Sequence, residues 1–439
     1  MLDKFKKHIN SHFSFLNKSK ILIAISGGLD SVVLTHLCHQ LNLNIALAHC
    51  NFNLRGKESD ADENFVFQLA EDLNIEVFIE DFDTENYAKE NKLSIQMSAR
   101  ELRYFWFDDL AEQLQFDYIL TAHHADDNLE TFLINLSRGT GIEGLTGIPE
   151  INNNIVRPLL PFSRDEIETY AKDNQLKWRE DSSNTSTKYL RNKLRHDVIP
   201  VLKEINPQLL QNFGKTLGFL QDSNEVLEDR IDDISNTIIT KVSEIEVQYS
   251  ISEIQKLNNS KAYLYQLLKD YGFSEWNDIV DLLNAQSGKQ IFSETHRLIK
   301  DRDVLILTEL CHSERSEESI LINNLDNSIK TPFGILFFDE ADALFGKRTN
   351  LIYVDIEKLK LPLTLRKWKE GDYFYPLGMT GKKKLSKYFK DEKMSLVDKE
   401  NTWLLCSKNE IIWVINRRAD ERFKAIKETK QILKIELRN

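Results

Sequence analysis

The fold is decided by the stretch ILIAISGGLDSVVL, which occupies residues 21–34 near the amino end. Its first five residues are apolar and mostly β-branched, a composition typical of a buried strand, and the apolar residues that close it indicate a helix. The loop between them has the pattern SGGxDS and consists of Ser26, Gly27, Gly28, Leu29, Asp30 and Ser31. A strand, a loop and a helix in this order predict an α/β fold with the loop at the carboxyl end of the strand.

The SGGxDS loop predicts a phosphate site. Two adjacent glycines reach backbone angles that are closed to other residues, so their N–H groups approach a phosphate with no Cβ in the way. The loop has no lysine and does not match the Gly-x-x-x-x-Gly-Lys-Ser/Thr pattern. An ordinary strand-to-helix turn with a serine cap is the alternative. Because two serines and Asp30 accompany the glycines, we expect the six residues to bind ATP, with Asp30 holding Mg²⁺ carried by the phosphates.

Length and composition bound the class of protein. A chain of 439 residues predicts about three domains. It contains no leader pattern and no apolar run long enough to span a bilayer, so we expect a cytoplasmic protein without a membrane partner. The four cysteines form no Cys-x-x-Cys pair, which argues against a zinc ribbon or a redox dithiol.

The charge of the chain is unevenly distributed. A formal net charge of −12 argues against indiscriminate binding of polyanions, since phosphate contacts need cations. Lys and Arg nevertheless gather in three groups, at residues 188–195, 382–390 and 417–427. A single group of this kind is typical of a solvated helix face. Three groups together favour a nucleic-acid partner.

Short β-rich runs alternate with longer helical runs between residues 20 and 160. The strand candidates are residues 21–25, 45–48, 76–80, 118–121 and 155–159. This alternation predicts a doubly wound, Rossmann-like parallel sheet. The period of residues 95–114 predicts a helix, and the sequence SRDE at 163–166 has the form of a capping box.

The chain as a whole divides into four predicted segments. Residues 205–300 contain no strong β run, residues from 320 onward are strand-rich, and the polar segment 311–319 is expected to be solvated. The segments are a catalytic α/β domain over 1–204, a mainly helical domain over 205–310, a linker with the first strands over 311–345, and a smaller α+β domain over 346–439.

A second polar cluster, HHADDNLET at residues 123–131, follows the strand candidate 118–121. If that strand is parallel to the first, the cluster emerges at the same sheet edge as the SGGxDS loop. Adjacent histidines do not easily share one tetrahedral ion, so a structural zinc site is disfavoured. We expect Asp126 or Asp127, with a histidine, to face a magnesium nucleotide or an amine, and Glu130 to cap the helix. A purely structural N-cap by Asp126 is the alternative.

Two further segments lie between residues 138 and 195. The glycine-rich segment 138–147 predicts a loop near the sheet edge and not a helix interior, with a plain connector as the alternative. Arg191 and Arg195 are four residues apart and share a helix face, and their planar guanidiniums suit phosphate. A salt-bridged surface helix is the alternative, which the scarcity of acidic residues nearby weakens.

Together these motifs resemble the PP-loop, or N-type, ATP pyrophosphatases, and among them the bacterial tRNA(Ile)-lysidine synthetases. In the first half, the resemblance rests on SGGLDS at 26–31, SARELRY at 98–104, the 123–131 cluster, RGTG at 138–141, RPLL at 157–160 and EDSSN at 180–184. Near the carboxyl end it rests on Arg366, Gly371-Asp372, Gly378-Met379, 381–384, Arg418 and Arg422-Phe423. The chain departs from the family pattern at Asn128, Tyr373 and Asn416, where glutamine, arginine and glycine are common.

The resemblance implies a C–N bond-forming ligase that acts in two steps on tRNA(Ile) with a CAU anticodon. ATP adenylates the C2 oxygen of the wobble cytidine, and free L-lysine then displaces AMP to leave lysidine. The implied catalytic residues are Asp30, Asp127, Arg103, Arg195 and His123. Asp30 and Asp127 are expected to hold the ammonium of lysine. The residues expected to contact tRNA are Arg191, Arg195, Arg366, Lys382, Lys383, Lys384, Arg418 and Arg422.

Three other functions remain open at this stage. A PP-loop tRNA thiolase also adenylates a tRNA base, but it normally needs catalytic or cluster-binding cysteines, and the four here are poorly placed. An ammonia-using amidoligase does not explain the basic carboxyl end. A non-catalytic tRNA-binding protein does not explain an intact SGGxDS loop. The sequence leaves the oligomeric state open, with a homodimer as one option.

Overall fold

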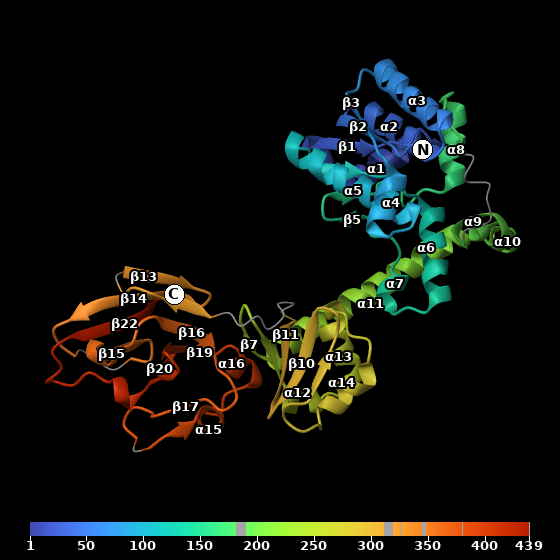
Figure 1. The fold of residues 1–439 in the computed structure, drawn as a ribbon. Helices are drawn as coiled ribbons and strands as arrows, with labels where there is room; N and C mark the ends of the chain where they lie inside the picture. Colours follow the sequence, from blue (N-terminus) through green and yellow to red (C-terminus); the bar gives the residue numbers. More distant parts are fainter. Residues whose placement is uncertain (181–189, 311–318, 326, 345–347, 380, 439) are drawn as a thin grey trace. The chain divides into compact units, whose positions relative to one another are not determined.

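The computed structural model describes residues 1–180, 190–310, 319–325, 327–344, 348–379 and 381–438. The chain forms two compact units, Met1–Asp229 and Arg230–Asn439 (Figure 1). Most of the predicted polar segment 311–319 and of the EDSSN motif lies outside the described residues. Of the helices that are described, none combines the length and the apolar character needed to cross a bilayer.

Six strands form the sheet of the first unit, in the order β3-β2-β1-β4-β6-β5. Their bounds are Lys20–Ala24 (β1), Asn44–Asn51 (β2), Val77–Asp81 (β3), Tyr118–Leu120 (β4), Ile151–Asn152 (β5) and Ile155–Val156 (β6). All neighbours are parallel except β5 and β6, which are antiparallel. The strand order reverses between β1 and β4, and ligands of doubly wound folds bind outside the carboxyl ends of the strands at such a reversal.

Helices cover both faces of this sheet (Figure 1). The helices that lie in this unit or begin in it are Leu2–His12 (α1), Leu29–Gln40 (α2), Lys57–Leu73 (α3), Thr84–Asn91 (α4), Ile95–Leu114 (α5), Ala125–Arg138 (α6), Ile142–Leu145 (α7), Arg164–Asp173 (α8), Leu190–Lys193 (α9), Ile199–Ile205 (α10) and Leu209–Ile238 (α11). Ile21 and Ile23 of β1 face a core shared with α1, α2, α3 and α8, whereas Leu22 faces a core shared with α5. Because successive strand residues point to opposite faces, the unbroken apolar run of β1 reflects burial on both sides.

The predicted α/β architecture and most of its element positions are confirmed. Each strand candidate overlaps an observed strand, and the helix predicted over 95–114 is α5. The capping box begins α8, since the Ser163 hydroxyl and the Glu166 carboxylate each accept the backbone N–H of the other at 3.1 Å. The last candidate is shorter than predicted, and β6 ends at Val156 because Pro158 has no N–H for a ladder.

The glycine-rich segment holds a short helix that the sequence did not predict. One helical turn, α7, includes Gly144, so the expectation of a plain loop was wrong there. The segment is fastened to α6 by Asn128, whose side-chain oxygen accepts the backbone N–H of Ile148 at 2.7 Å. Gly147 has φ +80°, and a Cβ at this position would meet the Asn128 oxygen at 2.4 Å. Asn128 is therefore a packing contact of this segment.

The second unit contains more strands than the sequence predicted. Residues 205–300 were expected to be mostly helical, but a five-stranded sheet in the order β7-β8-β11-β10-β9 lies between residues 239 and 309. Its strands are Ile239–Val242 (β7), Val247–Ser250 (β8), Gln290–Phe292 (β9), His296–Asp301 (β10) and Val304–Glu309 (β11). Strands β7, β8 and β9 are three or four residues long and carry polar residues, so they leave no long β-rich run in the sequence. Strands β10 and β11 are six residues long, and their central residues are buried. The helices that pack on it are Ile251–Gln255 (α12), Ser260–Leu268 (α13) and Trp276–Leu282 (α14).

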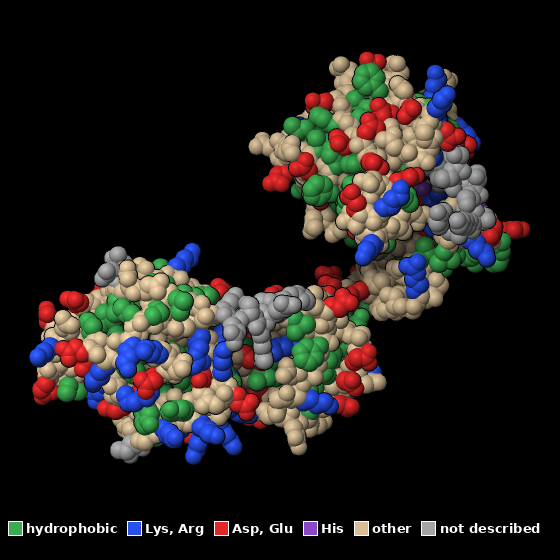
Figure 2. Space-filling model, in the orientation of Figure 1, with side chains coloured by type: hydrophobic (Ala, Val, Ile, Leu, Met, Phe, Trp, Pro, Cys, Tyr) green, Lys and Arg blue, Asp and Glu red, His purple; other side chains and the backbone are tan. Residues whose placement is uncertain are grey.

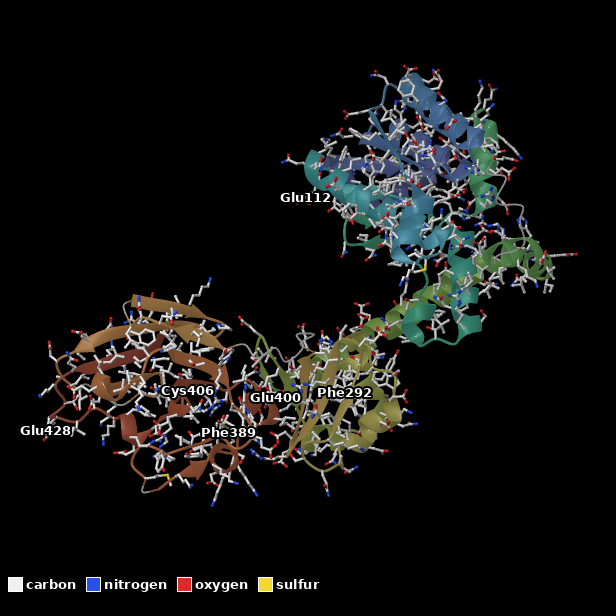
Figure 3. The ribbon with its side chains drawn as sticks, in the orientation of Figure 1. Glu112, Phe292, Phe389, Glu400, Cys406 and Glu428 are labelled. Atoms are coloured by element: carbon white, nitrogen blue, oxygen red, sulfur yellow. The ribbon has the colours of Figure 1, made fainter. Side chains whose placement is uncertain are left out.

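The carboxyl-terminal part of this unit is strand-rich, as predicted. Its sheets have the orders β12-β16-β19-β20-β21, β13-β14-β22-β15 and β17-β18. The strands are Ile320–Ile322 (β12), Asn327–Thr331 (β13), Gly334–Ala341 (β14), Leu351–Asp355 (β15), Leu363–Lys367 (β16), Tyr373–Phe374 (β17), Lys383–Lys384 (β18), Trp403–Ser407 (β19), Glu410–Val414 (β20), Arg418–Ala419 (β21) and Ile432–Arg438 (β22), with helices Leu385–Asp391 (α15) and Leu396–Glu400 (α16). Phe389 and Cys406 belong to its core, and Glu400 pairs with Arg297 of β10 (Figure 3).

Candidate active site

The SGGxDS loop connects β1 to α2 and is closed by its own hydroxyl groups. The Ser31 hydroxyl donates to the carbonyl of Gly28 at 3.0 Å, and its oxygen accepts the N–H of Ser26 at 3.2 Å. Gly27 has φ +82°, and a Cβ there would lie 3.3 Å from Phe65 of α3. Glycine is therefore required at this position both for its backbone angle and for space. The first turn of α2, which carries Asp30, directs its free N–H groups at the carboxyl edge of the sheet.

The second cluster lies at the same edge, where β4 leads into α6. His124 is the N-cap residue of α6, and the Asp127 carboxylate accepts its backbone N–H at 3.1 Å. The buried His124 ring lies between two carboxylates, with Nε2 at 3.3 Å from Asp127 Oδ2 and 3.7 Å from Asp30 Oδ2. The two aspartates that the sequence analysis grouped are thus brought together, and His124, which it did not single out, connects them.

Each aspartate also has an arginine partner. Nη1 of Arg164, the first residue of α8, donates to Asp30 Oδ2 at 3.1 Å. Nη2 of Arg195 donates to Asp127 Oδ1 at 3.0 Å. Arg164 was not predicted as a site residue. Its only sequence signal was its place inside the capping box.

Glu130 anchors the arginines at positions 191 and 195. Its side chain is 1% exposed and accepts Arg195 Nε at 2.6 Å and Arg191 Nε at 2.9 Å. The two arginines share a face, as their spacing predicted, across α9 and a π-helical turn over Leu194–Val198. Glu130 was expected to cap α6, but it holds this network instead. The acidic partners come from α6, which is distant in sequence, so the scarcity of acids near the arginines was no guide.

Asp126 is not the cap of α6 either. Its carboxylate accepts the backbone N–H of Arg164 at 2.8 Å and pairs with Lys203 of α10 at 2.6 Å. Asp126 therefore ties the first turn of α8 and α10 to the first turn of α6.

The two aspartates of the cluster have opposite pKa shifts. Burial raises the pKa of Asp30 above its ordinary value, against the opposing charges of His124 and Arg164. Burial also acts on Asp127, but His124, His123 and a backbone hydrogen bond outweigh it and lower the pKa of Asp127. Asp127 is therefore the fixed anion, and Asp30 is the carboxylate that takes a proton more readily.

His123 is buried beside this cluster. Burial lowers its pKa to about 4, so the ring is neutral near pH 7. Its Nδ1 lies 3.0 Å from the Thr121 hydroxyl at the end of β4. A neutral imidazole in this position orients neighbours by hydrogen bonding and adds no positive charge.

Arg103 occupies a different part of the edge. It lies over the ring of Phe52, 5.2 Å from the centroid, and Phe52 stacks on Phe82 with centroids 5.7 Å apart. Phe52 and Phe82 follow the ends of β2 and β3. The structure thus places Arg103 on the ring of Phe52, within an aromatic pair that follows the ends of β2 and β3.

Arg179 binds both the SGGxDS loop and α3, and we call this set of contacts the Arg179 clasp. The backbone N–H of Arg179 donates to the carbonyl of Gly27 at 2.9 Å. The Arg179 side chain pairs with the carboxylate of Asp62 on α3, which also accepts Arg55 Nη2 at 2.6 Å. Neither Asp62 nor Arg55 belongs to a motif that the sequence analysis used, so this contact was not foreseen.

The arginines predicted to contact tRNA in the second unit are held by protein groups. Arg366 makes two 2.8 Å bonds to Asp372, Arg422 pairs with Asp420, and Arg418 donates to the carbonyl of Leu377.

The predicted lysines of the same unit are more open. Lys383 pairs with Asp391 at 2.7 Å, whereas Lys382 and Lys384 are exposed. Lys382 lies over the ring of Tyr373, 5.3 Å from its centroid. Figure 2 shows Lys and Arg side chains over the visible face of the carboxyl-terminal sheets, interspersed with Asp and Glu.

The residues around Asp30 suit a magnesium ion that arrives with phosphates. Asp30 Oδ1 is buried and has no hydrogen-bond partner in the described part of the chain. The described residues contain no group of three or more His, Cys, Asp or Glu side chains that would hold a metal on their own. Mg²⁺ commonly takes one or two carboxylates and completes its shell with phosphate and water, and Asp30 fits that pattern.

Comparisons with known proteins cover nearly the whole chain. Residues 1–202 match the PP-loop domain model, residues 242–310 the TilS substrate binding domain, and residues 363–437 the TilS substrate C-terminal domain. A tRNA(Ile)-lysidine synthase of Parabacteroides distasonis is 40% identical over 439 residues, 99% of either chain. One from Bacteroides thetaiotaomicron is 39% identical, with 97% of each chain covered.

Two solved structures align with parts of the chain. The U34-tRNA thiolase NcsA of Methanococcus maripaludis aligns with a TM-score of 0.41 at 18% identity, covering 49% of this chain and 78% of the thiolase. A TilS C-terminal domain aligns with a TM-score of 0.25 at 20% identity, covering 28% of this chain and 99% of that domain.

Proposed function

Because the chain belongs to the tRNA(Ile)-lysidine synthase family, we propose that it joins free lysine to C2 of the wobble cytidine of CAU-anticodon tRNA(Ile) in an ATP-dependent reaction. The observation that carries the proposal is the meeting of Asp30, His124 and Asp127 beside the SGGxDS loop. This places a phosphate cradle next to a buried pair of carboxylates. ATP activation and capture of an amine are thereby supported at one sheet edge.

The first step activates the base. The C2 oxygen of the cytidine attacks the α-phosphorus of ATP, an O–P bond forms, and pyrophosphate leaves. The N–H groups of the loop and of the first turn of α2 hold the phosphates in line, and Mg²⁺ at Asp30 would neutralise charge on them. The clasp of Arg179 on Gly27 holds the loop closed for this step.

The second step transfers lysine. Its ε-ammonium binds between Asp30 and Asp127 and loses a proton, the free amine attacks C2, and the C2–O bond breaks so that AMP leaves with the former oxygen. Asp30 is the proton acceptor that we assign, because burial raises its pKa, whereas Asp127 remains ionised. Arg195 holds Asp127 from the other side. Neutral His123 orients the edge of β4.

The tRNA is proposed to contact both units. Exposed Lys382 and Lys384 supply cations for its phosphates. Arg191 and Arg195 act mainly by positioning Glu130 and Asp127, since their guanidiniums are already bound there.

Transfer of sulfur is not favoured by the described cysteines. Cys38 lies in α2, Cys50 in β2 and Cys406 in β19 of the other unit. Burial raises the pKa of Cys50 to about 12 and that of Cys406 to about 11, which opposes formation of a thiolate.

The test is incorporation of labelled lysine into RNA. The full-length protein is mixed with ATP, Mg²⁺, labelled lysine and an unmodified tRNA(Ile) transcript with a CAU anticodon, and label and AMP are counted. We expect one label and one AMP per tRNA. A transcript with a different anticodon and the Asp127→Asn variant are the controls, and both are expected to incorporate none. Tight tRNA binding without AMP release would contradict the proposal and favour a non-catalytic tRNA-binding protein.

A further inference from the structure

The arginines on the two catalytic carboxylates are held very differently. Arg195 is bound by buried Glu130 through Nε and Nη2 in addition to Asp127. Arg164 contacts Asp30 through Nη1 alone, and its side chain is 41% exposed. Among the described residues, no other side chain binds its guanidinium. Displacing Arg195 would break its bonds to buried Glu130, which is costly. Displacing Arg164 breaks one half-exposed ion pair, and pairs of this kind contribute little to stability.

The main chain at Arg164 is fixed even though its side chain is not. Its backbone N–H is bound by the Asp126 carboxylate at 2.8 Å, and Asp126 is in turn paired with Lys203. The preceding residue is held in the capping box of α8. The guanidinium can therefore leave Asp30 by rotation of the side chain, with no change in the helix.

Asp30 is incompletely satisfied while Arg164 occupies it. Oδ2 accepts the guanidinium, but Oδ1 is buried and has no partner among the described residues. A buried acceptor without a donor is costly, and few remain so in native proteins. A primary ammonium has three donors and reaches both oxygens of one carboxylate, which the single Nη1 contact does not.

We propose that Arg164 is a placeholder cation, which neutralises Asp30 in the empty enzyme and is exchanged for the ε-ammonium of the incoming lysine. This inference rests on the proposed function and adds a positioning residue to it. The exchange replaces one monovalent cation by another, so the charge at the buried carboxylate does not change. Asp127 keeps its own arginine throughout, because Glu130 anchors it.

The exchange has a measurable consequence for lysine affinity. Lysine binds only to the fraction of molecules in which Asp30 is open, so the apparent dissociation constant equals the intrinsic one divided by that fraction. Removal of the guanidinium opens every molecule. For a half-exposed pair, the expected gain in lysine affinity is about two- to fivefold.

The test compares lysine binding and kinetics in Arg164→Gln, Arg164→Lys and the unchanged full-length protein. Arg164→Gln is expected to lower the dissociation constant and the KM for lysine about two- to fivefold. Arg164→Lys restores a placeholder and is expected to bind lysine as the unchanged protein does. Added guanidinium ion is expected to compete with lysine more strongly in Arg164→Gln, because the open carboxylate is available to it.

Asp165→Asn is the matched control in the same turn of α8. Asp165 is 81% exposed and pairs with Lys203, so its loss changes local charge without touching Asp30. Its lysine affinity is expected to be unchanged. Lysine affinity that is unchanged, weaker or undetectable in a folded Arg164→Gln variant would overturn the proposal, as would a gain confined to ATP. A protein that binds lysine with the predicted differences but transfers none to tRNA would instead refute the proposed function.

Discussion

The arginines at the sheet edge of the first unit and the lysines beside β18 in the second unit are arranged in opposite ways. In the first unit, Arg191 and Arg195 converge on Glu130, a carboxylate hidden from solvent. In the second, Lys382 and Lys384 are exposed. Guanidiniums paired with a buried carboxylate hold a fixed geometry, whereas exposed ammonium groups remain available to a large polyanion. The comparison teaches that the first unit positions small reactive groups and the second is suited to attract RNA.

The strongest way to break the first arrangement is to remove its central charge. Glu130→Gln removes the carboxylate that binds both guanidiniums and leaves Arg195 with Asp127 alone, and we expect lysidine formation to fall at least about 100-fold and unfolding to become easier by about 1–3 kcal/mol. Single-turnover transfer of labelled lysine and denaturant unfolding measure the two effects. Glu168→Gln, which removes an exposed partner of Lys172, is the control and should change stability by less than about 0.5 kcal/mol. Near-normal transfer by Glu130→Gln would show that the network is dispensable.

The phosphate loop offers the next largest effect. Gly27→Ala places a Cβ 3.3 Å from Phe65 at a φ of +82°, so the loop must shift. We expect ATP to bind about tenfold more weakly, corresponding to about 1–2 kcal/mol of backbone strain. Equilibrium binding of a non-hydrolysable ATP analogue measures this. Gly214→Ala on α11 has open space around it and should leave ATP binding unaltered. Unchanged affinity for ATP in Gly27→Ala would indicate that this loop does not bind the nucleotide.

A further effect concerns acid stability. The pKa of His123 is lowered by burial from its ordinary value of 6.5 to about 4, so the unfolded chain binds a proton that the folded chain does not between these pH values. The stabilisation is full above pH 6.5 and is lost as the pH falls toward 4, by up to about 3 kcal/mol. Urea unfolding at pH 7 and pH 4.5 should show a smaller difference in His123→Asn than in the unchanged protein. If both proteins lose the same stability between pH 7 and pH 4.5, groups other than His123 cause the acid sensitivity.

The smallest effect is expected at the exposed lysines. Lys384→Gln should raise the KM for tRNA about two- to fivefold and flatten its salt dependence by roughly one counterion, with ATP binding unchanged. Kinetics at several salt concentrations measure this. Lys330→Gln changes an exposed lysine of β13 and serves as the comparison. If both variants behave alike, the effect reflects general charge and not a tRNA contact near β18.

The sequence predicted the sheet of the first unit because its signals are local. The apolar run of β1, the glycines of the loop and the capping box at Ser163 each depend on a few adjacent residues. In the five-stranded sheet over residues 239–309, β7, β8 and β9 were missed because they are short and partly exposed. The buried centres of β10 and β11 were a β signal that the prediction of a mainly helical domain overlooked. A strand of this kind has no distinctive pattern until its neighbours are known.

The contacts of the candidate site were harder to predict from the sequence than the strands were. The meeting of Asp30 and Asp127 was predictable, since both follow neighbouring parallel strands. The partners Arg164 and Glu130 could not be predicted, because an ion pair between residues far apart in the sequence produces no recognisable spacing. The roles of Arg103, Arg366 and the other proposed site residues remain predictions.

The contact between Asn128 and the turn at Gly147 constrains how this enzyme can be combined with its relatives. The family resemblance implies glutamine at position 128, and this longer amide would need space next to Gly147, where a Cβ would already meet the Asn128 oxygen at 2.4 Å. Grafting the relatives' residue alone would push the turn off α6. Chimaeras should therefore exchange position 128 and residues 144–148 as one block.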